Sequence, residues 1–507
     1  MRHVVLLVVC AAAAWPSFWM PFRGDEACYL TTARETAFGE VLYRDNWDVT
    51  NPGIFWFYQV AGTLFGFTED GVRLLEALWQ TAFAFAVSIA AKRSYGLPRL
   101  PVLPGAVVVA VYYLAGYSNT NHLARVEGLI PFLFFLAVWC PTAAMTAGRR
   151  AWLWLLVGGL AGGLIPVFKL MFGGVAILAW LVLAVEFSRR RDGSKLGNLG
   201  LFSLFIGLGA VAPLAITCAD FAAHDALGDY LWTTFEAPTL ILNEAEPVSA
   251  NRLVVLARWS TATLAGPTAL ALVAVACSLR HGRDPVTVSL VVLLMLSVPA
   301  ILAQRLSWWT YHAMLPAGLL AALGGYGLPA ISAMLRERLL GGESVRETLV
   351  LAAAFLFASA PLIAAGGYQW LVGAKHRFGL TTADRAIARA SQGHAYEFAQ
   401  SEADWLRQPE RKSGCIFVAG DPLISFLADR RLGIGVPGWA LEMWPAAIGR
   451  RLAEQVRDRR PAYVYVCRKE DDYETLIRRK YPELQAVLDT DYVVAKQDAR
   501  GVWYEAK

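Results

Sequence analysis

Long apolar runs separated by short polar connections occupy most of the chain up to residue 372. A helix needs about 20 apolar residues to cross the hydrocarbon core of a bilayer. Because lipid offers no partners for backbone polar groups, the spans are predicted to be helices. The first run is His3–Met20, which makes about eleven predicted spans with the ten that follow. Those ten lie at roughly 71–91, 100–117, 126–147, 152–168, 170–187, 198–218, 253–279, 286–303, 311–333 and 347–372.

The first run, His3–Met20, has two interpretations. Ala11–Ala14 offers small residues at which a signal peptide would be cleaved. The apolar character, however, continues through Trp15–Met20 and places Trp at the expected membrane interface. This continuity favours a first span that stays in the protein.

Residues 21–70 interrupt the pattern and predict an external loop. Leu30–Leu42 mixes apolar and polar residues at helical spacing, and residues 46–53 are rich in turn formers. Ile54–Phe67 is too short to span and suits a helix lying in the interface. A plain solvated loop is the alternative, and the aromatic content argues against it. The charged positions of the first segment, expected to face water, are Arg34, Glu35 and Glu40.

The sequence after residue 374 has the composition of a soluble domain. We therefore predict a transmembrane domain over 1–374 and a small α/β domain over 375–507. A second long external loop, 219–252, is expected to hold interfacial helices or a lid. In the C-terminal domain, predicted strands lie at 415–419, 463–467, 491–495 and 502–505, and predicted helices at 446–459 and 473–480.

Composition supports a polytopic α-helical membrane protein. Of the 507 residues, 56% are hydrophobic and 17% are charged, against about 25% charged residues in soluble proteins. The net charge of +5 is modest and gives no indication of nucleic-acid binding. The seven cysteines form no metal-ligand spacing, which argues against structural zinc. Cys415 and Cys467 are the one pair that could form a disulfide, if their domain is extracytoplasmic.

Basic residues fall in alternate connections between the predicted spans. By the positive-inside rule these connections are cytoplasmic. The N-terminus is then cytoplasmic, and the C-terminal domain lies outside, in the periplasm if the membrane is a bacterial inner membrane. The basic connections hold Lys92–Arg93, Arg149–Arg150, Arg189–Arg191 with Lys195, Arg280 with Arg283, and Arg336 with Arg338.

The outward connections carry ionisable groups close to the membrane boundary, where desolvation is costly. Each has an ordinary explanation on its own: Lys169 could snorkel, Arg125 and Glu127 could form a local ion pair, and His312 could be a satisfied interfacial histidine. Together they suit binding an anionic headgroup and removing a proton. The set comprises Asp25, Glu26, Arg125, Glu127, Lys169, Arg305, Tyr311 and His312.

The same positions resemble those of the GT-C class of integral-membrane glycosyltransferases, in particular family 39 with the protein O-mannosyltransferases and the lipid A aminoarabinose transferases. The resemblance covers most of residues 1–330 and the plan of an extracytoplasmic C-terminal domain. The segments that carry it are Asp25-Glu26-Ala27-x-Tyr29, Gly39-Glu40-x-Leu42-Tyr43-Arg44-Asp45, Asp48-x-x-x-Pro52-Gly53, Arg125-x-Glu127, Lys169 and Tyr311-His312-x-x-Leu315-Pro316.

This resemblance implies inverting transfer of one sugar from a polyprenyl-phosphate donor to a hydroxyl of a lipid, glycan or protein acceptor. Asp25 would be the general base, with a pKa raised by partial desolvation and a neighbouring acid. Glu26 would orient the acceptor or assist a metal. Candidate phosphate ligands are Arg125, Lys169, Arg305 and His312, and further substrate-binding candidates are Tyr29, Tyr43, Asp48, Asn51, Glu127 and Tyr311.

One position departs from the family. Aminoarabinose transferases carry a phosphate-binding lysine before the proline of the third segment, and this chain has Asn51 there. The donor phosphate would then depend on another cation, such as Lys169 or Arg305. No dedicated metal motif is evident, and a divalent cation near Glu26 stays an open alternative.

Two other classes of function compete with the transferase. A lipid or solute transporter or flippase would show internal repeats and midplane charges, and neither is evident. A polymerase or ligase using a diphosphate lipid would carry larger basic external loops. The C-terminal domain has no catalytic motif and is interpreted as a scaffold or a docking domain for the acceptor.

Overall fold

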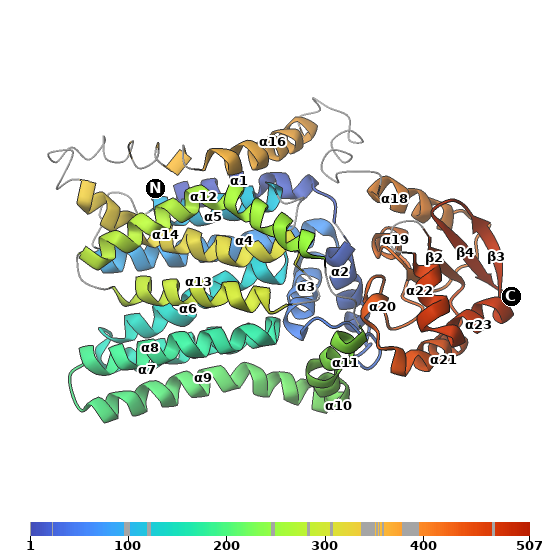
Figure 1. Cartoon of the computed structure of the whole chain (residues 1–507), viewed down its shortest axis with the longest axis horizontal. Coiled ribbons are helices and arrows are strands. Elements are labelled where there is room, and N and C mark those ends of the chain that lie inside the picture. Colours follow the sequence, from blue (N-terminus) through green and yellow to red (C-terminus); the bar gives the residue numbers. More distant parts are fainter. Residues whose placement is uncertain are drawn as a thin grey trace. The chain divides into compact units, whose positions relative to one another are not determined.

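The computed structural model describes residues 2–22, 24–95, 102–118, 123–244, 249–280, 284–304, 308–335, 359–377, 395–468 and 472–507, with 350, 353, 355 and 356. The chain forms two compact units (Figure 1). We call them the helical unit and the sheet unit. The helical unit comprises Met1–Met20, Arg73–Thr217 and Pro247–Ala386, and the sheet unit comprises Pro21–Val72, Cys218–Glu246 and Ile387–Lys507.

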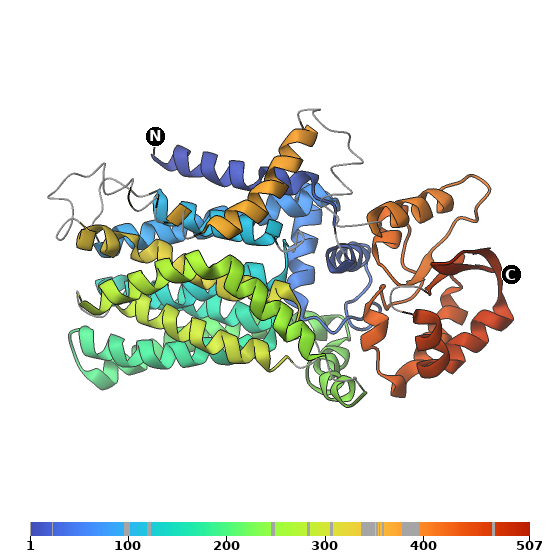
Figure 2. The same cartoon turned by 45° about the horizontal axis from the view of Figure 1, so that its top comes forward.

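Apolar helices build the helical unit, and Figures 1 and 2 show α6 to α9 running side by side. Short 3-10 turns sit at several of the connections. The elements are α1 (Arg2–Ala14), η1 (Trp15–Trp19), α4 (Glu69–Tyr95), α5 (Leu103–Ser118), α6 (Val126–Ala144), η2 (Gly148–Arg150), α7 (Ala151–Phe168), η3 (Leu170–Phe172), α8 (Gly173–Arg190), α9 (Lys195–Ala223), α12 (Ala250–Arg280), α13 (Pro285–Leu302), η5 (Thr310–Ala313), α14 (Met314–Leu335) and α16 (Ala360–Arg377).

Eight helices in the described part of the chain are long and apolar enough to cross a membrane. They coincide with predicted spans. The first predicted span corresponds to α1 with η1, which counts as a ninth candidate only in combination with α2 (Gly24–Ala37). The remaining two predicted spans contain the shorter helix α5 and the described helix α16. The predicted multi-pass helical membrane protein is therefore confirmed.

Glycines allow α7 and α9 to pack backbone to backbone. A Cβ added at Gly159 would lie 2.4 Å from the carbonyl oxygen of Ile206, and one at Gly163 would lie 2.3 Å from that of Ala210. These two glycines are four residues apart and share one face of α7. Small residues at this spacing let membrane helices approach closely where no hydrophobic effect drives them together.

Basic residues from three predicted cytoplasmic connections lie at one end of the helical unit. Arg191, after α8, donates to the carbonyl oxygens of Ala144 at 3.3 Å and of Gly148 at 3.0 Å. The guanidinium of Arg93, at the end of α4, lies 5.0 Å from the ring centre of Trp154 in the second turn of α7. We call this the basic end of the helical unit. Arg336 and Arg338 lie outside the described residues.

A four-stranded sheet with the order β1-β2-β4-β3 organises the C-terminal part of the sheet unit. β1 pairs parallel with β2, and β4 pairs antiparallel with both β2 and β3. All four predicted strands and both predicted helices are confirmed. The elements are α18 (Ala395–Leu406), β1 (Ile416–Ala419), α19 (Leu423–Ala428), α20 (Ala440–Met443), η7 (Ala446–Ile448), α21 (Gly449–Arg459), β2 (Tyr463–Cys467), α22 (Tyr473–Lys480), α23 (Pro482–Asp491), β3 (Tyr492–Gln497) and β4 (Gly501–Ala506).

The first predicted external loop and residues 219–246 of the second belong to the same compact unit as this sheet. The first holds α2 and α3 (Pro52–Phe65); the second holds α10 (Leu227–Leu231), the π-helical turn η4 (Trp232–Glu236) and α11 (Ala237–Glu244). The predicted interfacial segment at residues 54–67 is thus helical. One prediction is wrong: Glu35 is fully buried and does not face water. Cys415 and Cys467 are both free thiols.

Candidate active site

The adjacent acids Asp25 and Glu26 lie in the first turn of α2. Successive residues of a helix point in directions about 100° apart, so the two side chains enter different surroundings. Asp25 is half-buried, whereas Glu26 is completely buried. The free N–H groups and the dipole at a helix N-terminus favour a carboxylate at this position. Of the two acids, Asp25 is the more exposed.

Gly24 is the first residue of α2, and the surrounding structure leaves no space for a side chain there. A Cβ at this position would lie 1.7 Å from the indole of Trp439, which belongs to the C-terminal part of the sheet unit. Trp439 itself is half-buried. The aromatic ring therefore packs directly on the backbone that precedes Asp25. No local signal predicts this contact, because Trp439 lies more than 400 positions away.

Asp48 lies buried in the connection between α2 and α3. Its carboxylate accepts a hydrogen bond from the backbone N–H of Thr50 at 2.7 Å, which closes a local turn. The thiol of Cys28 in α2 lies 3.5 Å from the other carboxylate oxygen. Burial raises the pKa of Asp48, and these hydrogen bonds only partly offset the effect.

The other candidates of the first loop surround this turn. The hydroxyl of Tyr43 donates to the carbonyl oxygen of Thr50 at 2.7 Å, and burial raises the pKa of Tyr43 well above its ordinary value. Asn51 precedes Pro52, the first residue of α3, and is half-buried. The ring of Tyr29 packs edge-on against Tyr58, with ring centres 5.6 Å apart. The structure thus gathers Tyr43 and Asp48 beside Asn51.

A second group of candidates meets inside the helical unit. Lys169 lies between α7 and η3, and its ammonium is 2.5 Å from a carboxylate oxygen of Glu127 in the first turn of α6. His312 of η5 places Nε2 3.6 Å from the same oxygen. Arg125 immediately precedes α6, and its guanidinium lies 5.0 Å from the ring centre of Tyr311. We call Arg125, Glu127, Lys169, Tyr311 and His312 the cationic cluster.

Burial and position set the cationic cluster apart from ordinary surface charges. Arg125, Glu127 and His312 are each at most 3% exposed, and Lys169 is partly exposed. The cluster lies where α6 begins and α7 ends, whereas the basic end contacts the last residue of α6 and the second turn of α7. Glu127 forms an ion pair with Lys169. Arg305 lies outside the described residues.

A buried network supports the backbone in front of Arg125. Glu76 of α4 accepts hydrogen bonds from the Tyr112 hydroxyl and from the backbone N–H of Ala124, the latter at 3.1 Å. Arg73 lies 3.3 Å from the other carboxylate oxygen, and both of these charged side chains are fully buried. Ala124 has a φ of 51°, a left-handed conformation that costs energy for a residue with a Cβ. The Glu76 bond helps to hold this strained backbone next to Arg125.

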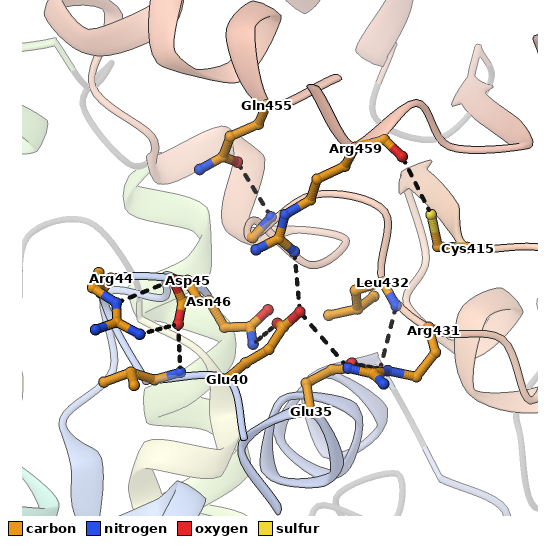
Figure 3. Close-up of polar contacts among 12 residues, drawn as sticks. Glu35, Glu40, Arg44, Asp45, Asn46, Cys415, Arg431, Leu432, Gln455 and Arg459 are labelled. Carbon is orange, nitrogen blue, oxygen red and sulfur yellow. Dashed lines mark hydrogen bonds and ion pairs between the residues drawn. The ribbon is translucent and has the colours of Figure 1, made fainter. Parts of the chain in front are cut away.

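Ion pairs join the first external loop to the C-terminal part of the sheet unit (Figure 3). Arg431 binds the buried carboxylate of Glu35, and Arg459 donates to Glu40 at 3.1 Å. The side chain of Asn46 also donates to Glu40 at 2.5 Å. Sequence reasoning missed these pairs, because the partners lie about 400 positions apart and no local signal links them.

Within the described residues, no group of three or more histidine, cysteine, aspartate or glutamate side chains could hold a metal ion. A divalent cation near Glu26 stays a prediction that these residues do not test.

The fold is that of the GT-C glycosyltransferases. ArnT from Cupriavidus metallidurans, bound to undecaprenyl phosphate, superposes with a TM-score of 0.55 at 16% identity, covering 99% of this chain and 97% of ArnT. Its apo state gives a TM-score of 0.57 at 17% identity with the same coverage. AglB from Archaeoglobus fulgidus, in complex with an inhibitory peptide and a dolichol-phosphate, gives 0.50 at 12% identity, covering 100% of this chain and 74% of AglB. No protein-family model and no curated protein sequence matches the chain.

Proposed function

We propose that the protein is an inverting glycosyltransferase that moves one sugar from a polyprenyl-phosphate donor to an acceptor hydroxyl at the outer face of the cytoplasmic membrane. The acceptor is a lipid, a glycan or a protein. The observation that carries the proposal is the cationic cluster, buried in a bundle with the GT-C fold. Ionisable side chains are rare inside membrane bundles and mark sites of function.

Asp25 is the general base of the proposed reaction. The acceptor oxygen attacks C1 of the sugar while its proton passes to the Asp25 carboxylate. The bond between C1 and the phosphate oxygen breaks, and its electron pair leaves with the polyprenyl phosphate. Attack from the face opposite the leaving group inverts the configuration at C1. The accessible position of Asp25 in the first turn of α2 supports this role.

The cationic cluster receives the departing phosphate. A polyprenyl-phosphate sugar is a phosphodiester with one negative charge, and the released monoester carries up to two. Arg125 and Lys169 bring two positive charges and Glu127 one negative charge, which leaves one net positive charge before His312 is counted. Groups that stabilise charge as it develops accelerate the reaction most. One net charge suits a monophosphate donor better than a diphosphate.

His312 offers a further ligand for the leaving group. Its Nε2 faces Glu127, while its Nδ1 has no hydrogen-bond partner among the residues described here. A buried polar atom without a partner is costly unless a ligand or water completes its bonding. A phosphate oxygen would satisfy Nδ1–H in the tautomer that carries the proton there.

Charge placement supports action at the outer face. The basic end of the helical unit carries the residues that the positive-inside rule assigns to the cytoplasm. The cationic cluster lies at the opposite ends of α6 and α7, and therefore faces the other compartment. Nucleotide-linked donors are cytosolic, so a membrane-delivered sugar phosphate is the donor that can reach it.

Donor binding tests the proposal. Undecaprenyl phosphate should raise the thermal unfolding temperature of the purified protein more than undecaprenyl diphosphate does. Arg125→Ala should weaken this binding by about tenfold or more, the loss expected for a charge-assisted bond of roughly 1.4 kcal/mol or more. Arg93→Ala, at the basic end, is the matched control and should bind as the wild type does. Equal losses in both variants, or no stabilisation of the wild type, would refute the proposed donor site.

A further inference from the structure

The C-terminal part of the sheet unit supplies the partner of a buried charge in α2. Glu35 is fully buried. Its carboxylate is bound closely by the guanidinium of Arg431, lies 3.4 Å from the backbone N–H of Leu432, and is 4.0 Å from the guanidinium of Arg34. A buried carboxylate without its cation is strongly destabilising. The C-terminal end of α2 therefore depends on a segment that is about 400 residues away in the sequence.

A second pair holds the turn that follows α2. Glu40 lies 3.1 Å from Arg459 at the end of α21 and 3.7 Å from Arg431 in the connection after α19 (Figure 3). One carboxylate therefore contacts two separate segments of the C-terminal part. The same carboxylate accepts from Asn46. Burial raises the pKa of Glu40, and the nearby Arg459 acts in the opposite direction. These contacts hold both ends of the turn from Glu40 to Asn46, which leads to Asp48: Arg459 and Arg431 bind Glu40, and Asn46 bonds to the same carboxylate.

The start of α2 is held by packing rather than by charge. The indole of Trp439 occupies the space that a side chain at position 24 would need. The thiol of Cys28, one turn further, lies 3.9 Å from the carbonyl oxygen of Pro437. A Cβ at Gly435 would lie 1.9 Å from the carbonyl oxygen of Asp45, so this loop also lies against the turn after α2. Residues 435–439 thus contact both segments that carry candidate carboxylates.

We propose that the C-terminal domain is a positioning element for the first external loop, and that Arg431 is its central positioning residue. This inference rests on the proposed function of Asp25. A general base must lie within hydrogen-bonding reach of the acceptor proton, and a displacement of about 1 Å can lower the rate by roughly 100-fold. Ion pairs at one end of α2 and aromatic packing at the other restrict such a displacement.

Arg431→Gln tests the inference through kinetics. With a polyprenyl-phosphate sugar as donor, kcat should fall by about tenfold to 100-fold, while the donor KM stays within about threefold of the wild type. Arg431→Lys keeps the charge but loses the forked geometry, and should recover part of the loss. The matched control is Asp429→Asn. It removes an ion pair with Arg34 in the same region, but the Asp429 side chain is 83% exposed, so kcat should change little.

Cys28 gives a readout that does not depend on activity. Its thiol is 5% exposed and faces Pro437, so loosening the contact exposes it. Maleimide labelling of the Cys28 peptide, followed by mass spectrometry, should be about tenfold faster in Arg431→Gln than in wild type or Asp429→Asn. If Arg431→Gln does not purify, Arg431→Lys replaces it in both measurements.

The two readouts separate failure of the inference from failure of the proposed function. If the wild type transfers no sugar, the proposed function fails, and Cys28 labelling still decides whether Arg431 holds α2. If the wild type is active and Arg431→Gln retains both its kcat and its Cys28 protection, the positioning role is overturned. A fall in kcat matched by an equal weakening of donor binding would also overturn it, because Arg431 would then act on the donor site.

Discussion

The ammonium of Lys169 lies 2.5 Å from a carboxylate oxygen of Glu127, and this contact joins the end of α7 to the start of α6. His312 of η5 lies 3.6 Å from the same oxygen. Three segments of the helical unit therefore converge on one carboxylate. Glu127 thereby holds the side chains of Lys169 and His312 close together at the start of α6.

Lys169→Met should weaken both stability and donor binding. Leaving Glu127 buried without its ammonium is expected to lower the free energy of unfolding by about 1–3 kcal/mol. Undecaprenyl phosphate binding should fall by about tenfold or more, because one phosphate ligand is lost. Thermal unfolding with and without the lipid measures both effects. The double variant Lys169→Met/Glu127→Gln should recover stability but not binding; recovered binding would remove Lys169 from the donor site.

Tyr112 and Tyr113 form a matched pair of adjacent buried tyrosines in α5. The Tyr112 hydroxyl bonds to Glu76, whereas that of Tyr113 has no hydrogen-bond partner within the described residues. Tyr112→Phe should therefore destabilise the protein by about 1–3 kcal/mol, and Tyr113→Phe should be nearly neutral or stabilising. Thermal unfolding of the two variants measures this difference. Equal effects would mean that the Glu76 network does not depend on Tyr112.

The titration of Asp48 should make the free energy of unfolding depend on pH. Burial raises its pKa in the folded protein, while the unfolded chain has the ordinary value of about 3.9. The folded state therefore holds this proton more tightly. Its contribution to stability is present below the unfolded pKa and is lost as the pH rises through the raised folded pKa.

Asp48→Asn removes this titration. The stability of the variant relative to the wild type should therefore increase as the pH rises from about 4. Thermal unfolding from acidic to neutral pH measures the trend, with the exposed Asp429→Asn as the reference for loss of a carboxylate. If the unfolding temperatures of Asp48→Asn and wild type differed by the same amount at every pH, Asp48 would not have a raised pKa in the folded protein.

The proposed orientation predicts opposite labelling of two exposed positions. Asp192 lies in the connection between α8 and α9, near the basic end, and Gln408 lies in the C-terminal part of the sheet unit. In spheroplasts, a membrane-impermeant maleimide should label Gln408→Cys but reach Asp192→Cys only after permeabilisation. The protein without an added cysteine gives the background from native thiols. The reverse pattern would place the cationic cluster in the cytoplasm and exclude a lipid-delivered donor at the outer face.

Much of the fold could be predicted because its signals are local. Runs of about 20 apolar residues fix the spans. Short stretches rich in Val, Ile, Phe and Tyr fix the strands, and all four predicted strands appear in the sheet. Basic residues in alternate connections predicted that Arg93 and Arg191 would lie at one end of the bundle, as they do.

The environment of the site could not be predicted because it depends on contacts between distant residues. Glu35 looked like a surface charge of an amphipathic segment, and only the folded structure shows its burial against Arg431, 396 positions away. Glu127 contacts Lys169, which is 42 positions away in the sequence. Neither the hydrophobic periodicity nor the composition of the sequence indicates these two pairings.

Sugar transfer by the Asp25→Asn variant is the direct test of Asp25 as the general base. The purified wild type and variant would be supplied with a panel of undecaprenyl-phosphate sugars and a membrane extract as acceptor, and release of undecaprenyl phosphate would be measured. We expect the wild type to release undecaprenyl phosphate with one of these donors. In Asp25→Asn, release should fall by about 100-fold or more, with unchanged undecaprenyl phosphate binding and thermal unfolding. Full activity in the variant would contradict the assignment of Asp25 as the base.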